Sequence, residues 1–486
     1  MPRSWLGLSL VLLVTCASAD ERVATPRPIP ATRPEMKRLL EDMKTRKIRI
    51  PLPELTDAQK AELGERASGY ESRLRFHYLS DEPSVFGGGG GGGQRRGPGG
   101  APAAAAPGTA PPARDFTRNS DDNMTLSYQF KTMLFWIVSR TNNCQYCLGH
   151  QEQKLSATGM LDDEIAALDA DWSRFKPEEQ AAFAYARKLT YEPNKLSDAD
   201  IDALRKHYTD LQILEMTMSV SWNNSINRWK EGAGIPQSHD GANFFRRATN
   251  IPADRPVPNE SFLTPTSETF AAAVTKVAPL EIDLKTGQPT RMAISTRPAL
   301  ESRAEVEAAL IAARQRQPRL PVLSEDDARK AFGEAAPEGR LPVWIRLMAN
   351  FPREASGRLP ALLALTANRG DLSPLLKAQV SWIIARQDRA WYATGVVKAR
   401  LQELGQTEDQ IYALDGKWDS VTPAERAMFK FARKLAATPI ALTDEDVEDA
   451  LQQTNPRQVV QLVNFVTSRA FFDRVTEAAG LPIDAP

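Results

Sequence analysis

Two cysteines and one histidine are the residues of this chain whose types and spacing could do chemistry. They lie in the stretch Asn143-Cys144-Gln145-Tyr146-Cys147-Leu148-Gly149-His150, and the one other cysteine, Cys16, lies near the N-terminus. Two thiols at this spacing can close and reopen a small disulfide, and the start of a helix lowers a thiol's pKa. His150 follows Cys147 by three residues, so a helix would place both on one face, where the imidazole could move protons for the thiol.

Other roles for the cysteine pair explain this spacing less well. A structural disulfide closing so small a loop would remove only about 2 kcal/mol of unfolded-state chain entropy. A structural zinc site needs four ligands, and the pair supplies two. Covalently attached haem needs a histidine directly after the second cysteine, where Leu148 stands. The spacing therefore favours redox or catalytic thiols, with no metal and no cofactor.

The elements that must position these thiols occur twice in the chain. Residues 131–236 align with residues 377–482 at a constant offset of 246 without a gap, with 33 identities in 106 pairs. Trp136 meets Trp382, and Arg140 meets Arg386. A single register kept over this length predicts two similar units, which we call the first repeat (131–236) and the second repeat (377–482).

The second repeat keeps the pattern but not the reactive side chains. At the 246 offset, Cys144 corresponds to Ala390, Cys147 to Ala393 and His150 to Val396. Tyr146 and Gly149 are retained as Tyr392 and Gly395. We therefore expect thiol chemistry in the first repeat alone.

The periodicity of both repeats predicts an all-α fold of two tandem helical domains. Apolar residues recur at helical spacing in 131–140, 161–170, 177–190 and 211–230, and no strand alternation is sustained. Capping residues begin further helices at 197–200 and 443–446. We place the first domain at 20–240, a Pro-rich linker at 241–298 and the second domain at 299–486. Residues 85–114 are a Gly/Ala/Pro-rich insertion that we expect to be disordered.

The N-terminus has the pattern of a secretory signal. Arg3 precedes an apolar run that ends at Ala17-Ser18-Ala19, a small-residue cleavage site. Residues 1–19 therefore predict an exported protein, periplasmic or secreted; the alternative is a lipoprotein acylated on Cys16. Beyond this run no segment could span a membrane, and 61 basic residues balance 61 acidic ones, which indicates no nucleic-acid partner.

The stretch FWIVSRTNNCQYCLGHQ resembles the carboxymuconolactone decarboxylase and alkylhydroperoxidase D-like superfamily, over about 100 residues of each repeat. The resemblance implies that Cys147 attacks a peroxide and that Cys144 resolves the resulting sulfenic acid. The family's proton relay uses a glutamate and a histidine at positions that hold Thr132 and Gln151 here, while His150 stands one place early.

The resemblance implies an exported thiol peroxidase that reduces hydroperoxides and is reset by an external dithiol. Two alternatives remain open at this point. One is a decarboxylase- or isomerase-like enzyme in which His150 is the acid–base group. The other is a non-enzymatic helical binding or scaffold protein with a residual disulfide. The substrate, the reductant and the oligomeric state, including a homo-oligomer, are not determined by the sequence.

Overall fold

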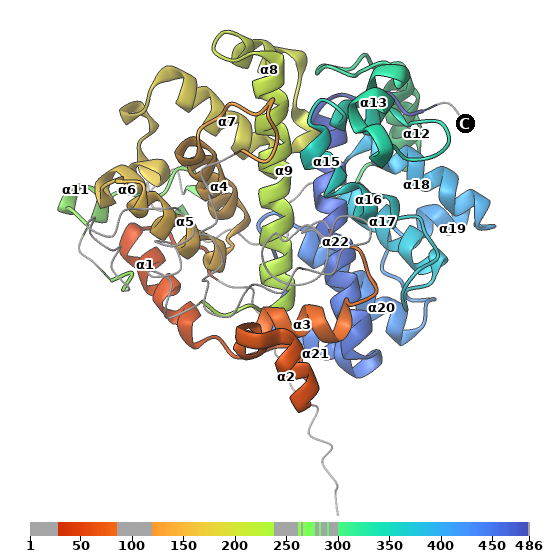
Figure 1. Ribbon diagram of the computed structural model, residues 1–486, viewed down its shortest axis with the longest axis horizontal. Helices are drawn as coiled ribbons and strands as arrows, with labels where there is room; N and C mark the ends of the chain where they lie inside the picture. Colours follow the sequence, from red (N-terminus) through yellow and green to blue (C-terminus); the bar gives the residue numbers. More distant parts are fainter. Residues whose placement is uncertain are drawn as a thin grey trace, which may run out of the picture.

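A computed structural model gives the arrangement of the chain (Figure 1). It describes residues 28–84, 119–237, 261–263, 266–277, 281–282, 289–290 and 300–484. The predicted signal peptide, the insertion at 85–114 and most of the linker lie outside the described residues. Within them the all-α class is confirmed, because the only strands are two residues each, β1 (Glu281–Ile282) and β2 (Pro289–Thr290), paired antiparallel.

The N-terminal half of the described chain is built from nine α-helices, followed by a short tenth one. Their bounds are α1 Arg33–Asp42, α2 Asp57–Leu63, α3 Tyr70–Tyr78, α4 Tyr128–Asn142, α5 Gln145–Ala157, α6 Asp162–Ala170, α7 Pro177–Tyr191, α8 Asp198–Arg205, α9 Asp210–Ala233 and α11 Glu268–Ala271. Short 3-10 helices lie at Met43–Thr45, Gly64–Ser68, Trp172–Arg174 and Pro193–Lys195.

The C-terminal half contains eleven described helices and one further 3-10 turn, Gly333–Ala335. Their bounds are α12 Arg303–Arg314, α13 Glu325–Phe332, α14 Val343–Met348, α15 Pro352–Ser356, α16 Leu359–Leu363, α17 Pro374–Asp388, α18 Trp391–Glu403, α19 Glu408–Ala413, α20 Pro423–Ala436, α21 Asp444–Gln453 and α22 Pro456–Ala478.

Local sequence signals account for several helix ends. Pro177 begins α7 at a position that lacks an intrahelical N–H partner in any case. At the start of α8 the Asp200 carboxylate accepts from the backbone N–H of Ser197 at 2.8 Å. Gly234 ends α9 with φ 67°, a left-handed conformation that suits glycine. The starts of α7 and α8 follow the sequence prediction.

The helices of the two repeats correspond in order and in position. The start of α4 at Tyr128 and the start of α17 at Pro374 differ by 246 residues, and the same offset relates α5 to α18 and α7 to α20 at their first residues. The left-handed residue that ends the first helix of each repeat is also shared, because Asn143 has φ 56° and Arg389 has φ 53°. The left-handed turn between the first two helices is therefore present in both repeats.

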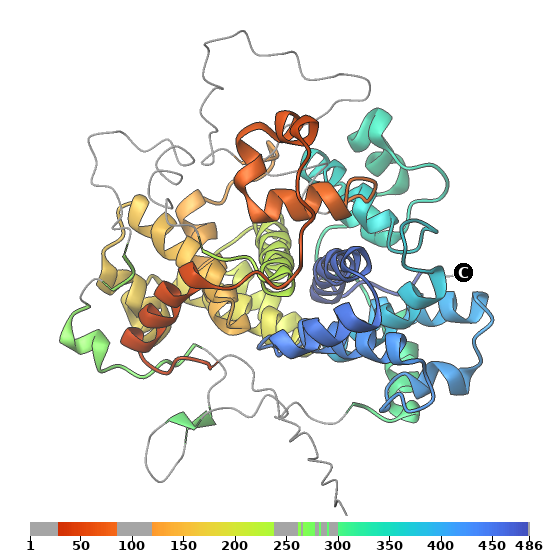
Figure 2. The same cartoon turned by 90° about the horizontal axis from the view of Figure 1, so that it is seen from below.

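The longest helices, α9 and α22, pack against each other at the centre of the molecule and are seen end-on, side by side, in Figure 2. Gly232 of α9 permits this close approach, since a Cβ there would lie 2.8 Å from a methyl group of Val463. A single continuous cluster of buried side chains includes residues of both repeats. The two predicted domains thus share one core, and the boundary assigned to the linker remains a prediction.

Two arginines related by the 246 offset join the repeats reciprocally. Arg228 of α9 donates to the carbonyl of Ala436 at 3.0 Å, and Arg474 of α22 donates to the carbonyl of Thr190 at 3.2 Å. Thr190 and Ala436 are themselves 246 residues apart. Each repeat therefore makes the same crossing contact with the other, as the two halves of a symmetric interface do.

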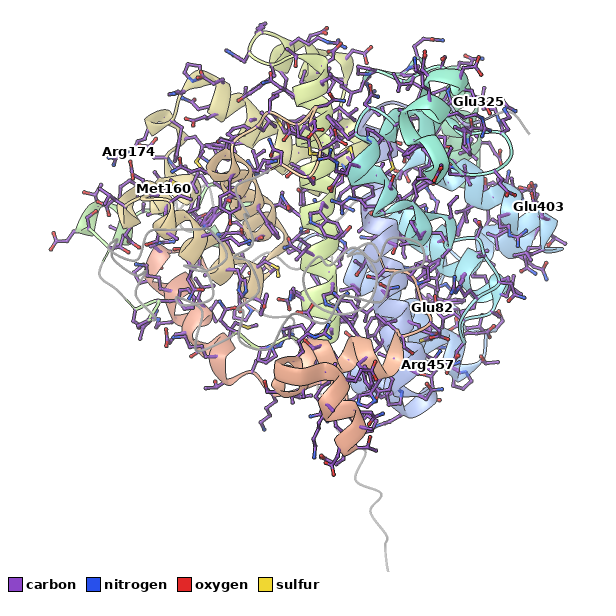
Figure 3. The ribbon with its side chains drawn as sticks, viewed as in Figure 1. Glu82, Met160, Arg174, Glu325, Glu403 and Arg457 are labelled. Carbon is purple, nitrogen blue, oxygen red and sulfur yellow. The ribbon has the colours of Figure 1, made fainter. Side chains whose placement is uncertain are left out.

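The segment after α3 leaves the first half of the chain and lies against the second. Arg457 at the start of α22 binds the carboxylate of Asp81 at 2.7 Å, and Asn464 donates to the carbonyl of Pro83 at 3.1 Å. Figure 3 shows Glu82 and Arg457 on the same side of the molecule, close to α3. The segment that follows α3 is therefore anchored on the second repeat.

Candidate functional site

The two cysteines occupy the first turn of α5. α4 ends at Asn142, Asn143 turns the chain in the left-handed region, and Cys144 becomes the N-cap residue of α5. The Cys144 sulfur accepts from the backbone N–H of Cys147 at 3.4 Å. Both are free thiols, with exposed fractions of 0% for Cys144 and 1% for Cys147. The thiols are therefore adjacent and shielded from bulk solvent.

Burial raises the pKa of the Cys144 thiol well above its ordinary value. The hydrogen bond with Cys147 and the negative charge of a Cys147 thiolate raise this pKa further, as does the carboxylate of Glu231. The low pKa expected of a thiol at a helix start is thus not found at Cys144. Burial therefore favours the protonated form of Cys144.

His150 lies against Tyr146 one turn earlier on α5. The two rings stack with centroids 4.5 Å apart, and Nε2 of His150 lies 3.2 Å from the Tyr146 hydroxyl. Nδ1 lies 3.2 Å from Oε1 of Gln237, a carbonyl oxygen that can only accept, so the proton of the neutral ring belongs on Nδ1. Both ring nitrogens are therefore engaged with other side chains.

The surroundings keep His150 uncharged. Burial lowers the pKa of this imidazole to about 3, and the positive charges of Lys230 and Lys154 act in the same direction. The sequence led us to expect a proton carrier for Cys147. A neutral ring with both nitrogens occupied is a weak base at neutral pH.

An ion pair between residues far apart in the sequence extends the polar contacts around Tyr146 and His150. Lys230 of α9 pairs with Glu71 of α3 and also lies 3.4 Å from the Tyr146 hydroxyl. Trp229 donates its indole N–H to Glu71 at 2.6 Å. Burial alone would raise the pKa of Glu71, but the charges of Lys230 and Arg75 outweigh it and lower this pKa to about 2. Helix α3 therefore belongs to the site.

Lys154 is a second cation near the thiols. It follows Cys147 by seven residues on α5, two turns later, and its ammonium group lies 5.9 Å from the centre of the Phe135 ring. Burial lowers the pKa of Lys154 to about 8, while the charge of a Cys147 thiolate opposes this shift. Lys154 and a thiolate at Cys147 thus stabilise each other.

The second repeat lacks the contact between His150 and Gln237 as well as the two thiols. Gly149 and Gly395 are equivalent, and each lets a side chain 88 residues later approach the helix: a Cβ at Gly149 would lie 2.9 Å from Gln237, and one at Gly395 would lie 2.5 Å from Ile483. His150 and Gln237, which contact each other in the first repeat, correspond to the apolar residues Val396 and Ile483 in the second. Both members of the polar pair are therefore replaced by apolar side chains.

The charged residues near the cysteines have structural partners. Glu152 binds Arg33 through two hydrogen bonds of 2.7 Å and also accepts from the indole of Trp136. Lys131 binds Glu215 at 2.9 Å. Both residues therefore form ion pairs that join separate helices.

The positions of the family's proton relay hold ordinary side-chain to backbone contacts. The hydroxyl of Thr132 donates to the carbonyl of Tyr128 at 2.7 Å, and Nε2 of Gln151 donates to the carbonyl of Cys147 at 3.2 Å. Gln151 is 2% exposed. A glutamine cannot carry a proton as a histidine does, so a relay of the family's kind is not formed by these two residues.

Sequence reasoning missed Gln237, Lys154 and the pair formed by Glu71 and Lys230. Gln237 stands one residue beyond the aligned repeats, and its counterpart Ile483 was the available signal. Glu71 and Lys230 are 159 residues apart, and nothing in the sequence connects them.

Among the described residues, no group of three histidine, cysteine or carboxylate side chains is arranged to hold a metal ion. No helix in the same part of the chain has both the length and the apolar character required to cross a bilayer. Comparison with protein-family models finds no match, and comparison with curated protein sequences finds none either.

Proposed function

We propose that the protein is a thiol oxidoreductase that reduces hydroperoxides with Cys144 and Cys147. The observation that carries the proposal is the pair itself: two free thiols share the first turn of α5, with the sulfur of Cys144 3.4 Å from the backbone nitrogen of Cys147. Residues three apart on a helix are neighbours, so disulfide formation requires only a local movement.

The reaction would proceed in two steps. The Cys147 thiolate attacks the terminal oxygen of ROOH, the O–O bond breaks, and ROH leaves after taking up a proton, so that Cys147 becomes a sulfenic acid. The Cys144 sulfur then displaces this oxygen as water and forms the disulfide. An external dithiol returns both sulfurs to thiols. The raised pKa of Cys144 disfavours the thiolate needed for the first attack, so we assign Cys144 the second role, in which its proton leaves with the water.

The electrostatics of the site support thiol chemistry over chemistry centred on the histidine. Lys154 stabilises a thiolate at Cys147, whereas His150 has a pKa of about 3 and both nitrogens engaged. A histidine acid of a decarboxylase- or isomerase-like enzyme would need to be protonated near neutral pH. The burial of both sulfurs favours a small hydroperoxide. Residues 1–19 support placing the reaction outside the cytoplasm.

A thiol titration tests the proposal. The reduced chain, carrying Cys16→Ser so that only the pair is counted, should show two thiols before and none after one equivalent of hydrogen peroxide. Cys147→Ser should keep its remaining thiol under the same treatment, whereas Cys144→Ser should accumulate a sulfenic acid that a dimedone-type reagent traps. A wild-type pair no faster than free cysteine at the same pH would refute the proposal.

A further inference from the structure

A short segment that precedes α1 lies against the turn that carries the thiols. The carbonyl oxygen of Pro28 accepts from the side-chain amides of Asn143 at 3.3 Å and Gln145 at 3.5 Å. These two residues stand on either side of Cys144, the buried N-cap residue of α5. Residues 28–31, which we call the strap, therefore meet the start of α5 at the residues that flank Cys144.

The strap is held firmly at one end and weakly at the other. Arg140 donates to the carbonyl of Pro30, and the backbone N–H of Thr275 donates to the carbonyl of Ala31 at 2.8 Å. Pro30 is buried, whereas Pro28 is exposed. The two hydrogen bonds to Pro28 are longer than the roughly 2.7–3.2 Å of most N–H···O hydrogen bonds. The Pro28 end can therefore leave α5 while the Pro30 end stays in place.

The second repeat has an equivalent segment that is held by charge. Ala31 and Glu301 each stand directly before the N-cap residue of a helix, α1 and α12 respectively, and they are 270 residues apart. The carboxylate of Glu301 pairs with Arg386 at 3.0 Å and also with Arg389. Arg386 donates in addition to the backbone carbonyl of Glu301 at 2.8 Å. Ion pairs therefore fasten this segment to the turn that leads into α18.

The first repeat lacks this fastening at the same positions. Ala31 offers no carboxylate, and Asn143 stands where the second repeat has Arg389. Nη1 of Arg140 corresponds to the atom of Arg386 that binds the carboxylate, and it is buried without a hydrogen-bond partner among the described residues. The repeat that carries the thiols therefore has the strap that is easier to release.

We propose that the strap is a gate over the thiol pair: its Pro28 end leaves α5 to admit the dithiol that reduces the disulfide. A thiolate of this dithiol attacks the sulfur of Cys144, the S–S bond breaks, and Cys147 leaves as a thiolate that takes up a proton. The second thiol of the reductant then loses its proton and displaces Cys144, which takes up a proton in turn. The reductant ends as a disulfide and both cysteines as thiols. This inference rests on the proposed function and identifies how the buried pair is reached.

Reduction of a preformed disulfide by dithiothreitol tests the gate. The chain carries Cys16→Ser, and diamide forms the disulfide, so that the measurement does not depend on peroxide. Asn143→Gly with Gln145→Ala removes both donors to Pro28, and glycine suits the left-handed φ of 56° at position 143. We expect this release variant to be reduced about fivefold faster than the wild type, because local opening controls access to a buried group.

A second variant closes the gate. Ala31→Glu with Asn143→Arg gives the first repeat the charged pair of the second, and it should slow reduction by about tenfold, because the ion pair must break before the pair of sulfurs is reached. The neutral version, Ala31→Gln with Asn143→Arg, should lose most of this effect. Glu301→Ala is the matched control: it loosens the equivalent segment where no thiol lies, and its reduction rate should equal that of the wild type. Melting temperatures of all variants separate gate opening from a general loss of stability.

The outcomes separate the gate from the proposed function. Equal reduction rates in the wild type, the release variant and the charged variant would overturn the gate. So would a Glu301→Ala protein accelerated as much as the release variant, because general loosening would then be what exposes the thiols. Slow oxidation of the wild type by hydrogen peroxide would instead refute the proposed function, while the effect of the strap on reduction would still stand.

Discussion

The backbone N–H of Cys147 points at the sulfur of Cys144, 3.4 Å away, across the first turn of α5. This contact makes Cys144 the N-cap residue, a position whose side chain normally accepts such a bond. Ala390, the counterpart in the second repeat, keeps the same backbone with φ −83° and ψ 92° but has no side-chain acceptor. The backbone geometry therefore does not depend on the thiol.

We predict that Cys144 and Cys147 form a reversible disulfide. Oxidation of the pure reduced protein should lower its mass by two hydrogen atoms, and dithiothreitol should restore the original mass. Peptide mapping should place the bridge between these two residues. A pair that stays reduced under excess peroxide, native or unfolded, would contradict the prediction.

A second prediction concerns the difference between the repeats. Cys144→Ala with Cys147→Ala gives the first repeat the residues of the second and should abolish peroxide consumption. The melting temperature should change little, because Ala390 and Ala393 occupy the same backbone sites fully buried. The experiment should use the full-length chain, because α9 and α22 belong to one shared hydrophobic core. Peroxide consumption that persists in the double variant would place the activity elsewhere.

Lys154 should accelerate the reaction of Cys147 through its charge. We expect Lys154→Gln to slow peroxide oxidation at pH 7 by about three- to tenfold, the effect of up to one unit in a thiol pKa. Lys154→Arg should restore most of the rate. Because the pKa of Lys154 is about 8, the advantage of the wild type over the glutamine variant should shrink between pH 7 and 9. Equal rates at pH 7 would exclude this electrostatic role.

His150 should make the folded protein less stable in acid. Its pKa is about 3 in the folded chain and about 6.5 when unfolded, so between these values the unfolded chain binds more protons and stability falls as the pH falls. Between pH 7 and 5 this linkage amounts to about 2 kcal/mol. Urea denaturation of the wild type and of His150→Gln at both pH values should show a smaller loss in the variant. An identical loss would mean that the imidazole is protonated in the fold.

Arg474 and Asp388 form a fully buried ion pair at 2.8 Å, both side chains having no exposed surface. Arg474→Met should cost about 3–5 kcal/mol of unfolding free energy, because the Asp388 carboxylate would be left buried without its cation. Adding Asp388→Leu should recover most of this loss. In the first repeat Arg228 meets the neutral Asn142, so Arg228→Met should cost less. Urea denaturation curves of the wild type, Arg474→Met, the double variant and Arg228→Met measure these differences in unfolding free energy.

The amino-acid sequence by itself determined the helical class, the repeat offset of 246 and the position of the thiols at a helix start. These features depend on residues close together in the chain: Pro177 at the first turn of α7, Asp200 capping α8, and Cys144 three residues before Cys147. Interactions across one helical turn follow from spacing alone, which is why the sequence predicts them.

Only the tertiary structure decided which side chains surround the thiols and what charge they carry. Gln237 reaches His150 from 87 residues away because the segment that follows α9 contacts α5, and Glu71 reaches Lys230 from 159 residues away because α3 contacts the end of α9. Sequence spacing suggested that His150 would serve Cys147. Burial beside two lysines instead lowers its pKa to about 3, and burial raises that of Cys144. Desolvation depends on how the whole chain packs, and no local pattern of residues encodes it.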